Sequence, residues 1–181
     1  GPLHIGHAYV LALNNEYAKK NKGKLILRIA DTNSENIDPE AYDMIPKDAD
    51  WLTKGNISQI IVQSDRLPIY YKYVEKLLDK DKIYICTCDQ EKFKNLLAKG
   101  QACPDRNLSK EEQKERWQKM LTTYKEGEAV VRLKTDLKDK NPAMRDFPLL
   151  RINTSSHAKQ KKKYRVWPLM NFAVSVDDIE S

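Results

Sequence analysis

The chain has 181 residues, enough to bury a full hydrophobic core and to hold one domain or one domain with an insertion. No run approaches the roughly 18 apolar residues of a membrane span and no signal peptide is visible, so we expect no membrane partner. The cysteine content favours a reducing compartment, so we expect a cytoplasmic protein. The net charge of +6 permits a nucleic acid partner without requiring one. Three cysteines cannot all pair with one another, which argues against a disulfide framework.

The chain opens on a short motif that contains two of its three histidines, Gly1-Pro2-Leu3-His4-Ile5-Gly6-His7, and leads into a helical pattern over 8–20. Residues three apart on a first helical turn share a face, so His4 and His7 should project beside the unpaired N–H groups and the positive dipole end. Gly6 leaves room for a flat group, such as a purine ring, against the backbone. The pattern therefore predicts an anion site, although an isolated His-x-x-His is also compatible with a plain helix start.

Strands and helices alternate through the first 85 residues. Apolar runs predict strands at 24–29, 60–62 and 83–85, and 3.6-residue periodicity predicts helices at 8–20, 39–52 and 70–78. Pro46 should kink the second helix or divide it in two. This alternation predicts an α/β fold with a doubly wound parallel sheet, which binds ligands at the carboxyl ends of its strands.

Beyond Cys86 the pattern changes to shorter, mixed elements. A helix at 93–97 is followed by a capping box at Ser109 and Glu112, which opens a second helix with Trp117 on its core side. Strands are expected at 128–135 and 149–153, and 164–168 should return the chain to the first sheet. We therefore predict a first half at 1–85, a smaller α+β insertion at 86–163, and a return at 164–181. His157 shows no partner in the sequence and is expected to be a loop residue.

A polar loop ends the strand at 24–29. Asp31, Thr32 and Asn33 offer a carboxylate, a hydroxyl and an amide, which could hold an amino group and ribose hydroxyls. An ordinary Asx turn would use the same residues, and the chemistry alone does not decide between the two.

The cysteines cluster in one stretch. Cys86, Cys88 and Cys103, together with Asp105, have the number of ligands of a tetrahedral zinc site, because thiolates favour zinc and a carboxylate can be the fourth ligand. The alternative is three thiols without a metal.

The opening motif resembles the HIGH signature of class I aminoacyl-tRNA synthetases, and the segment 28–33 resembles the Arg-x-Asp/Glu-Asp-Thr-Asn/Asp segment of glutamyl- and glutaminyl-tRNA synthetases. Further stretches resemble the archaeal glutamyl enzymes in the same order, at 60–66, 70–71, 84–88, 105–109, 126–134, 141–146 and 164–169. The resemblance therefore covers nearly the whole chain. It implies a Rossmann-like class I catalytic sheet interrupted by an insertion that binds the tRNA acceptor stem.

The resemblance also implies roles for particular residues. An ATP site would comprise Leu3, His4, Ile5, Gly6 and His7, with both histidines catalytic, and an amino-acid site would comprise Arg28, Ala30, Asp31, Met170 and Asn171. Ala30 stands where the family has an acidic residue, and Met170 where many relatives have a tyrosine, so we expect a variant mode of amino-acid binding. Some related enzymes hold a structural zinc in the insertion.

The implied reaction is the activation of glutamate with ATP and Mg²⁺, followed by transfer of glutamate to the 3′ end of tRNA(Glu). The basic segment 159–165 would meet acceptor-stem phosphates, and we expect a monomer. The alternatives are a glutaminyl-tRNA synthetase and a non-catalytic tRNA-binding paralogue. The sequence starts within a motif and contains neither a Lys-Met-Ser-Lys-Ser-like loop nor an anticodon-binding region, so we expect a truncated catalytic fragment that is inactive alone.

Overall fold

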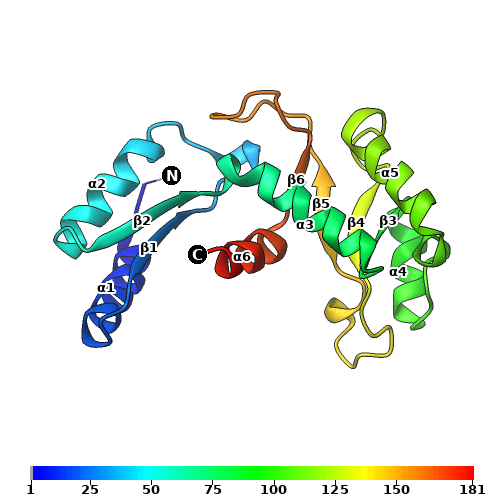
Figure 1. The fold of residues 1–181 in the computed structure, drawn as a ribbon, viewed down its shortest axis with the longest axis horizontal. Coiled ribbons are helices and arrows are strands. Elements are labelled where there is room, and N and C mark those ends of the chain that lie inside the picture. Colours follow the sequence, from blue (N-terminus) through cyan, green and yellow to red (C-terminus); the bar gives the residue numbers. More distant parts are fainter. Residues whose placement is uncertain (1) are drawn as a thin grey trace. The chain divides into compact units, whose positions relative to one another are not determined.

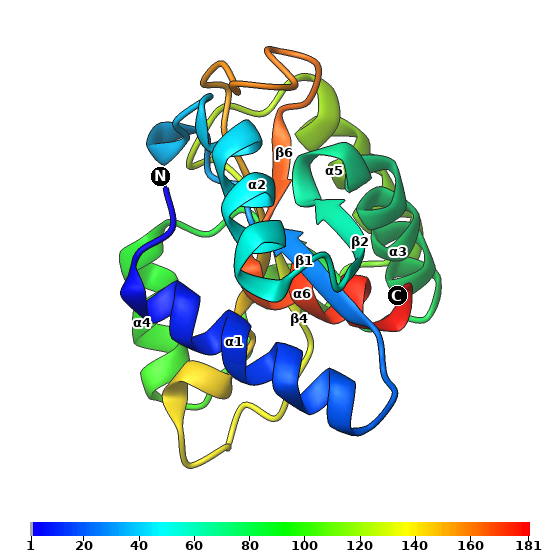
Figure 2. The ribbon, with the colours of Figure 1, turned by 90° about the vertical axis from the view of Figure 1, so that its left-hand side faces the viewer.

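A computed structural model describes residues 2–181, which form two compact units; Gly1 of the opening motif lies outside the described residues (Figure 1). The first unit contains the chain up to Asp65 together with the loop Ser156–Lys161. Its helices are α1 (Ile5–Lys20) and α2 (Ala41–Thr53), and its strands are β1 (Leu25–Ile29) and β2 (Ile57–Val62) (Figure 2). The strands run parallel, with Leu27 opposite Ile60, so the predicted α/β class with parallel strands is confirmed.

Local sequence explains most of this first unit. The short apolar run of β1 buries Leu25 and Ile29, as expected for a strand covered on its faces. Pro46 does not divide the second helix, because α2 continues through it; the alternative, a kink at Pro46, stays a prediction. Helix α1 does not bury its apolar face completely. The side chain of Val10 is 55% exposed and that of Tyr17 is 71% exposed.

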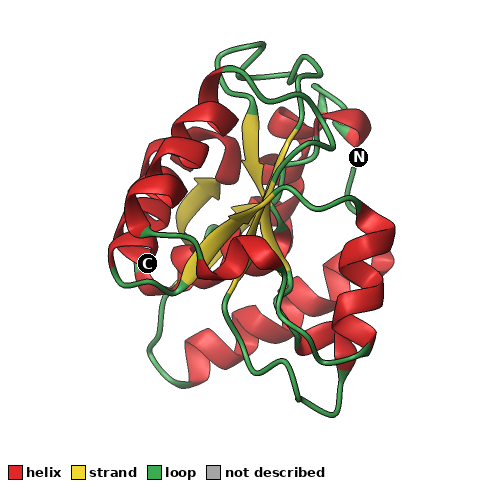
Figure 3. Cartoon of the chain, turned by 90° about the vertical axis from the view of Figure 1, so that its right-hand side faces the viewer, coloured by secondary structure: helices red, strands yellow, loops and turns green. Residues whose placement is uncertain are grey.

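The second unit contains Arg66–Ser155 and Lys162–Ser181. Four strands form one antiparallel sheet in the order β3 (Ile83–Cys86), β4 (Val130–Leu133), β5 (Pro148–Ile152) and β6 (Val166–Pro168). Figure 3 shows the strands of the chain in yellow and the helices in red. The helices of this unit are α3 (Leu67–Asp79), α4 (Gln90–Ala98), α5 (Lys110–Thr122) and α6 (Met170–Ile179). Helices α3 and α5 pack on β3, and α6 packs on β5.

Two strands differ from the sequence prediction. The strand at 83–85 was expected in the parallel sheet, but β3 is antiparallel to β4, with Ile85 opposite Val131. The segment 164–168 was expected to rejoin the first sheet, but β6 pairs with β5. An apolar run reveals that a strand is buried, yet it carries no information about the direction of its partner. The limits of an insertion at 86–163 stay a prediction.

The core of the second unit follows the predicted periodicity. Tyr70, Val74 and Leu78 form the buried stripe of α3, and Trp117 of α5 is 2% exposed, which confirms its assignment to the core. The capping box that opens α5 is also confirmed, because the Ser109 hydroxyl accepts from the Glu112 N–H and the Glu112 carboxylate accepts from the Ser109 N–H.

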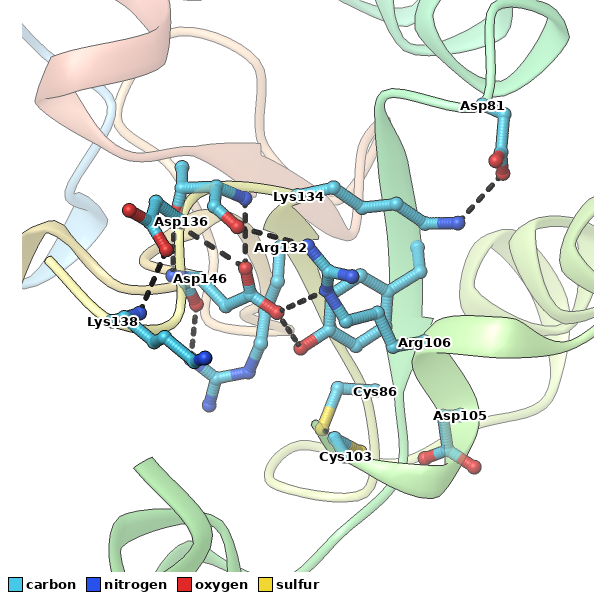
Figure 4. Close-up of polar contacts among 12 residues, drawn as sticks. Asp81, Cys86, Cys103, Asp105, Arg106, Arg132, Lys134, Asp136, Lys138 and Asp146 are labelled. Carbon is cyan, nitrogen blue, oxygen red and sulfur yellow. Dashed lines mark hydrogen bonds and ion pairs between the residues drawn. The ribbon is translucent and has the colours of Figure 1, made fainter. Parts of the chain in front are cut away.

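A buried carboxylate, Asp146, ties the edge of this sheet together (Figure 4). Its oxygens accept from Arg106 Nε at 2.9 Å, the Tyr84 hydroxyl at 3.0 Å and the Thr135 N–H at 2.8 Å. The side chain of Asp146 is fully buried. Burial and the adjacent carboxylate raise the pKa of Tyr84 far above its usual range, so this hydroxyl remains a donor.

Asp146→Ala is expected to lower the free energy of unfolding by about 3–5 kcal/mol, because Arg106 would lose its buried partner. Urea unfolding followed by tryptophan fluorescence measures this, since Trp117 and Trp167 are both buried in this unit. The matched control is Lys119→Ala, which breaks an exposed ion pair with Glu115 and should leave the urea midpoint unchanged. Equal midpoints for Asp146→Ala and the unaltered chain would contradict the role of this carboxylate.

Candidate functional site

The start of α1 is built by the two histidines of the opening motif. His4 is the N-cap, and its Nδ1 accepts from the Gly6 N–H at 3.1 Å. The His7 Nδ1 accepts from the His4 N–H at 3.4 Å, and the two rings lie 3.8 Å apart between centroids. A Cβ at Gly6 would approach the His4 ring to 3.0 Å, so glycine is what allows this ring to fold over the first turn.

These contacts determine which nitrogen of each ring points outward. Because each Nδ1 accepts a hydrogen bond, the proton of the neutral ring must be on Nε2. Both side chains are exposed, so His4 and His7 present Nε2–H donors to solvent beside the N-terminal end of the helix. Donors and a positive dipole end together favour an anion such as a phosphate.

A cleft of about 810 Å³ lies between α1, β1 and α2 within the first unit. Its lining includes residues from both predicted sites, namely Leu3, His7, Arg28, Ala30 and Asp31. The remaining residues of the predicted ATP site, His4, Ile5 and Gly6, lie on the adjoining first turn of α1. The structure thus brings the opening motif and the end of β1 to one cavity.

The carboxylate of Asp31 is engaged by internal donors. Its Oδ2 accepts from the Tyr42 hydroxyl at 2.6 Å, and its Oδ1 accepts from the Ser64 N–H at 2.8 Å. Only 4% of Asp31 is exposed. Burial is the main cause that raises the pKa of Tyr42 well above its usual range, and the hydrogen bond to Asp31 is the second. Tyr42 is therefore a donor at neutral pH.

His157 lies in a loop, as expected, but no pattern in the sequence indicated the partners that it has there. His157 is fully buried, and its Nε2 lies 2.7 Å from the main-chain oxygen of Asp31, 126 positions away in the sequence. Neither Tyr42, Ser64 nor His157 was identified as a site residue from the sequence. No local pattern marks them, because each is defined by its contact with Asp31.

Two residues of the predicted amino-acid site, Met170 and Asn171, belong to the second unit, where they begin α6. Met170 is 68% exposed, and the Asn171 side chain donates to the main-chain oxygen of Pro148 at 3.2 Å. Their role in amino-acid binding, like that of Arg28, Ala30 and Asp31, stays a prediction.

The predicted metal ligands are close together. One ligand atom from each of Cys86, Cys88, Cys103 and Asp105 lies within 4.8 Å of the others (Figure 4 labels three of these four residues). The Cys103 Sγ lies 3.6 Å from that of Cys86 and 3.0 Å from that of Cys88. Three thiols and a carboxylate fit zinc chemically, and tetrahedral Zn–S bonds of ~2.3 Å imply sulfur separations of about 3.8 Å. The Cys86–Cys103 separation is therefore already near that of a zinc site.

Electrostatics in this cluster favour a thiolate at one position. The hydrogen bond from Cys103 lowers the pKa of Cys86 to about 6, against the effect of burial. Burial acts to raise the pKa of Asp105, but donors from Thr87 and Arg116 outweigh it and hold this pKa below its usual value. Asp105 Oδ2 accepts from the Thr87 N–H at 2.7 Å, and Oδ1 lies 2.9 Å from Arg116, so this carboxylate also has protein partners.

The basic segment 159–165 contains both side chains with protein partners and exposed lysines. Lys159 forms an ion pair with Asp65, and Arg165 donates to the main-chain oxygens of Thr122 and Tyr124. The side chains of 161–163 are exposed. Contact of this segment with tRNA phosphates stays a prediction.

None of the helices that the structure describes has the length and the apolar character of a membrane span.

Comparison with known proteins defines the class. Residues 1–181 match the family model described as tRNA synthetases class I (E and Q), catalytic domain, and the chain belongs to this family. It is 51% identical over 178 residues to the glutamate–tRNA ligase of Methanothermobacter thermautotrophicus, which covers 98% of this chain and 32% of that relative. It is 52% identical to the glutamate–tRNA ligase of Nanoarchaeum equitans, again with 98% and 32% covered.

Solved structures agree on the fold. The glutamate tRNA ligase of Elizabethkingia meningosepticum, crystallised with its amino acid, matches with a TM-score of 0.65 and 21% identity, covering 99% of this chain and 40% of that chain. This likeness supports the Rossmann-like catalytic fold. The chain spans about a third of the length of these curated relatives.

All three histidines are expected to be Nε2–H tautomers in their neutral form, because every Nδ1 accepts at least one main-chain N–H. Long-range ¹H–¹⁵N spectra of the imidazoles, recorded above the ordinary titration range of histidine, distinguish the two tautomers. A His4→Ala variant assigns the signals and should release the His7 ring from its stacked partner. An Nδ1–H signal for His7 would contradict the assignment of its proton to Nε2, the nitrogen that faces solvent.

Proposed function

We propose that the full-length protein activates glutamate with ATP and transfers it to the 3′ end of tRNA(Glu). The observation that carries this proposal is the start of α1, where His4 and His7 present Nε2–H donors next to the cleft. Relatives about half identical to this chain are named glutamate–tRNA ligases, which supports glutamate as the amino acid.

In the first step, an oxygen of the α-carboxylate of glutamate attacks the α-phosphorus of ATP, and the bond from this phosphorus to the pyrophosphate oxygen breaks. No covalent bond to the protein is required. The two Nε2–H groups and the N-terminal end of α1 stabilise negative charge that develops on the α-phosphate and on the leaving pyrophosphate. Mg²⁺ would accompany ATP, held chiefly by the phosphates.

The amino acid would bind at the carboxyl end of β1, where Arg28 and Ala30 line the cleft. In the second step, a ribose hydroxyl of the terminal tRNA nucleotide attacks the activated carbonyl and AMP leaves. The exposed lysines at 161–163 supply positive charge for acceptor-stem phosphates. We propose a monomer in the cytoplasm.

His7→Ala in the full-length enzyme is expected to lower kcat for ATP–pyrophosphate exchange, measured with glutamate and tRNA, roughly 10²- to 10³-fold, because one donor to the transition state is lost. His7→Gln should recover part of this activity, since a glutamine amide reaches the position of Nε2. His7→Asn should recover less, since its amide reaches only the position of Nδ1.

The same assay separates the alternatives. Exchange with glutamine in place of glutamate would indicate a glutaminyl-tRNA synthetase. Binding of tRNA without exchange for either amino acid would indicate a non-catalytic tRNA-binding paralogue, the alternative suggested by Ala30 and Met170. Equal kcat for His7→Ala and the unaltered enzyme would exclude the proposed role of the opening motif.

We further propose that Cys86, Cys88, Cys103 and Asp105 hold a structural zinc ion. The supporting observation is the proximity of their ligand atoms, since thiol sulfurs and a carboxylate oxygen are ligands that zinc accepts. The pKa of Cys86 is lowered, whereas the pKa values of Cys88 and Cys103 are raised, so zinc would have to displace the protons of these two thiols. The site takes no part in the proposed reaction and would stabilise the chain around β3 and α4.

Metal analysis of the protein after reconstitution with zinc under reducing conditions is expected to give one zinc per chain. Cys103→Ser should abolish binding and lower the melting temperature, because this thiol is central to the cluster. Asp105→Asn should weaken zinc binding less, since three thiolates remain. If the reconstituted protein contained no zinc and its melting temperature equalled that measured before zinc was added, the result would favour a cluster of hydrogen-bonded thiols.

A further inference from the structure

His157 closes its own loop through its imidazole and main chain. Its Nδ1 accepts from the N–H groups of Lys159 and Gln160 at 3.1 and 3.0 Å. Its main chain also exchanges two hydrogen bonds of 2.9 Å with Lys161. The loop 156–161 is therefore held in one conformation, and the second ring nitrogen remains for a contact elsewhere.

That second contact reaches the end of β1. With Nδ1 acting as an acceptor, Nε2 carries the proton and donates to the main-chain oxygen of Asp31 at 2.7 Å. The donor is fully buried, so water cannot readily replace this hydrogen bond. The Gln160 side chain also donates a hydrogen bond to Asp65 at 2.7 Å. This hydrogen bond is exposed to solvent, so it contributes less to holding the loop than the buried bond from His157.

Asp31 is consequently fixed at two points. The hydroxyl of Tyr42 and the N–H of Ser64 hold its carboxylate, and His157 holds its carbonyl. Arg28 and Ala30 precede this residue directly and line the cleft. The conformation of the cleft wall at the carboxyl end of β1 thus depends on a side chain that lies more than a hundred residues further along the chain.

We propose that His157 is a positioning residue for the amino-acid side of the site: by fixing the main chain at Asp31, it holds the wall of the cleft in the conformation that binds glutamate. The proposal rests on the proposed function. His157 itself is buried beneath this wall and does not touch substrate. The nucleotide side is built separately, from contacts within the first turn of α1, and does not depend on His157.

Two amide substitutions, each of which reproduces one ring nitrogen, separate the two roles of the ring. Asparagine places its oxygen near the position of Nδ1, so His157→Asn can keep the loop closed but cannot reach Asp31. Glutamine places its amide near the position of Nε2, so His157→Gln can still donate to the Asp31 oxygen. Ser156→Ala is the matched control, because it alters the neighbouring exposed side chain of the same loop.

The test is ATP–pyrophosphate exchange by the full-length enzyme with tRNA present. We expect His157→Asn to raise KM for glutamate roughly tenfold, the effect of losing one buried hydrogen bond, while KM for ATP changes less than about twofold. His157→Gln should stay within about threefold of the unaltered enzyme for both substrates. Ser156→Ala should change neither KM.

An unchanged KM for glutamate in an active His157→Asn enzyme would overturn the proposal. An equal rise in KM for glutamate and for ATP would also overturn it, as would a lower kcat with both KM values unchanged. These outcomes indicate only a structural role. Failure of the unaltered full-length enzyme to show glutamate-dependent exchange would refute the proposed function and this inference together, whereas the outcomes above refute the inference alone.

Discussion

The carboxylate and carbonyl of Asp31 receive hydrogen bonds from three parts of the chain that are distant in sequence. Tyr42 lies on α2, Ser64 follows β2, and His157 belongs to a loop near the end of the chain. The pairing of β1 with β2 ends at Ile29 and Val62, so the loop that contains Asp31 lies beyond the hydrogen bonds of this sheet. The hydrogen bonds to Asp31 hold this loop, and those from Ser64 and His157 are buried, so either donor would be left unsatisfied without its acceptor at a cost of roughly 1–3 kcal/mol.

The second unit has a polar centre of the same kind. Asp146 gathers Arg106, Tyr84 and Thr135, in the way that Asp31 gathers donors in the first unit. In both cases an acidic residue is buried, and both of its carboxylate oxygens accept hydrogen bonds. Such groups add less to stability than apolar packing of the same volume, but they tolerate few alternative arrangements. The four-stranded sheet and the cleft therefore each owe a defined geometry to one carboxylate.

Sequence patterns predicted the parts of the molecule that local rules govern. The capping box at Ser109, the core position of Trp117 and the helix that starts beside His4 all depend on neighbours within one or two turns. The partners of β3 and β6 depend on chain segments many residues away, and periodicity could not assign them. The contact of His157 with Asp31 could not be predicted from the sequence for the same reason. Its sequence neighbours are polar, and the contact that buries it lies at the other end of the chain.

The same distinction separates the two sides of the candidate site, for which we propose nucleotide binding at the start of α1 and amino-acid binding at the end of β1. On the nucleotide side, the orientation of His4 and His7 is set by hydrogen bonds to the adjacent backbone, so a seven-residue motif is sufficient to specify it. On the amino-acid side, Ala30 has no side-chain acceptor, and both oxygens of Asp31 already accept from the protein. An incoming ammonium group would have to share these oxygens with Tyr42 and Ser64 rather than meet a free carboxylate. The amino-acid side therefore depends on how accurately the surrounding backbone is held, and it cannot be deduced from the motif that surrounds Asp31.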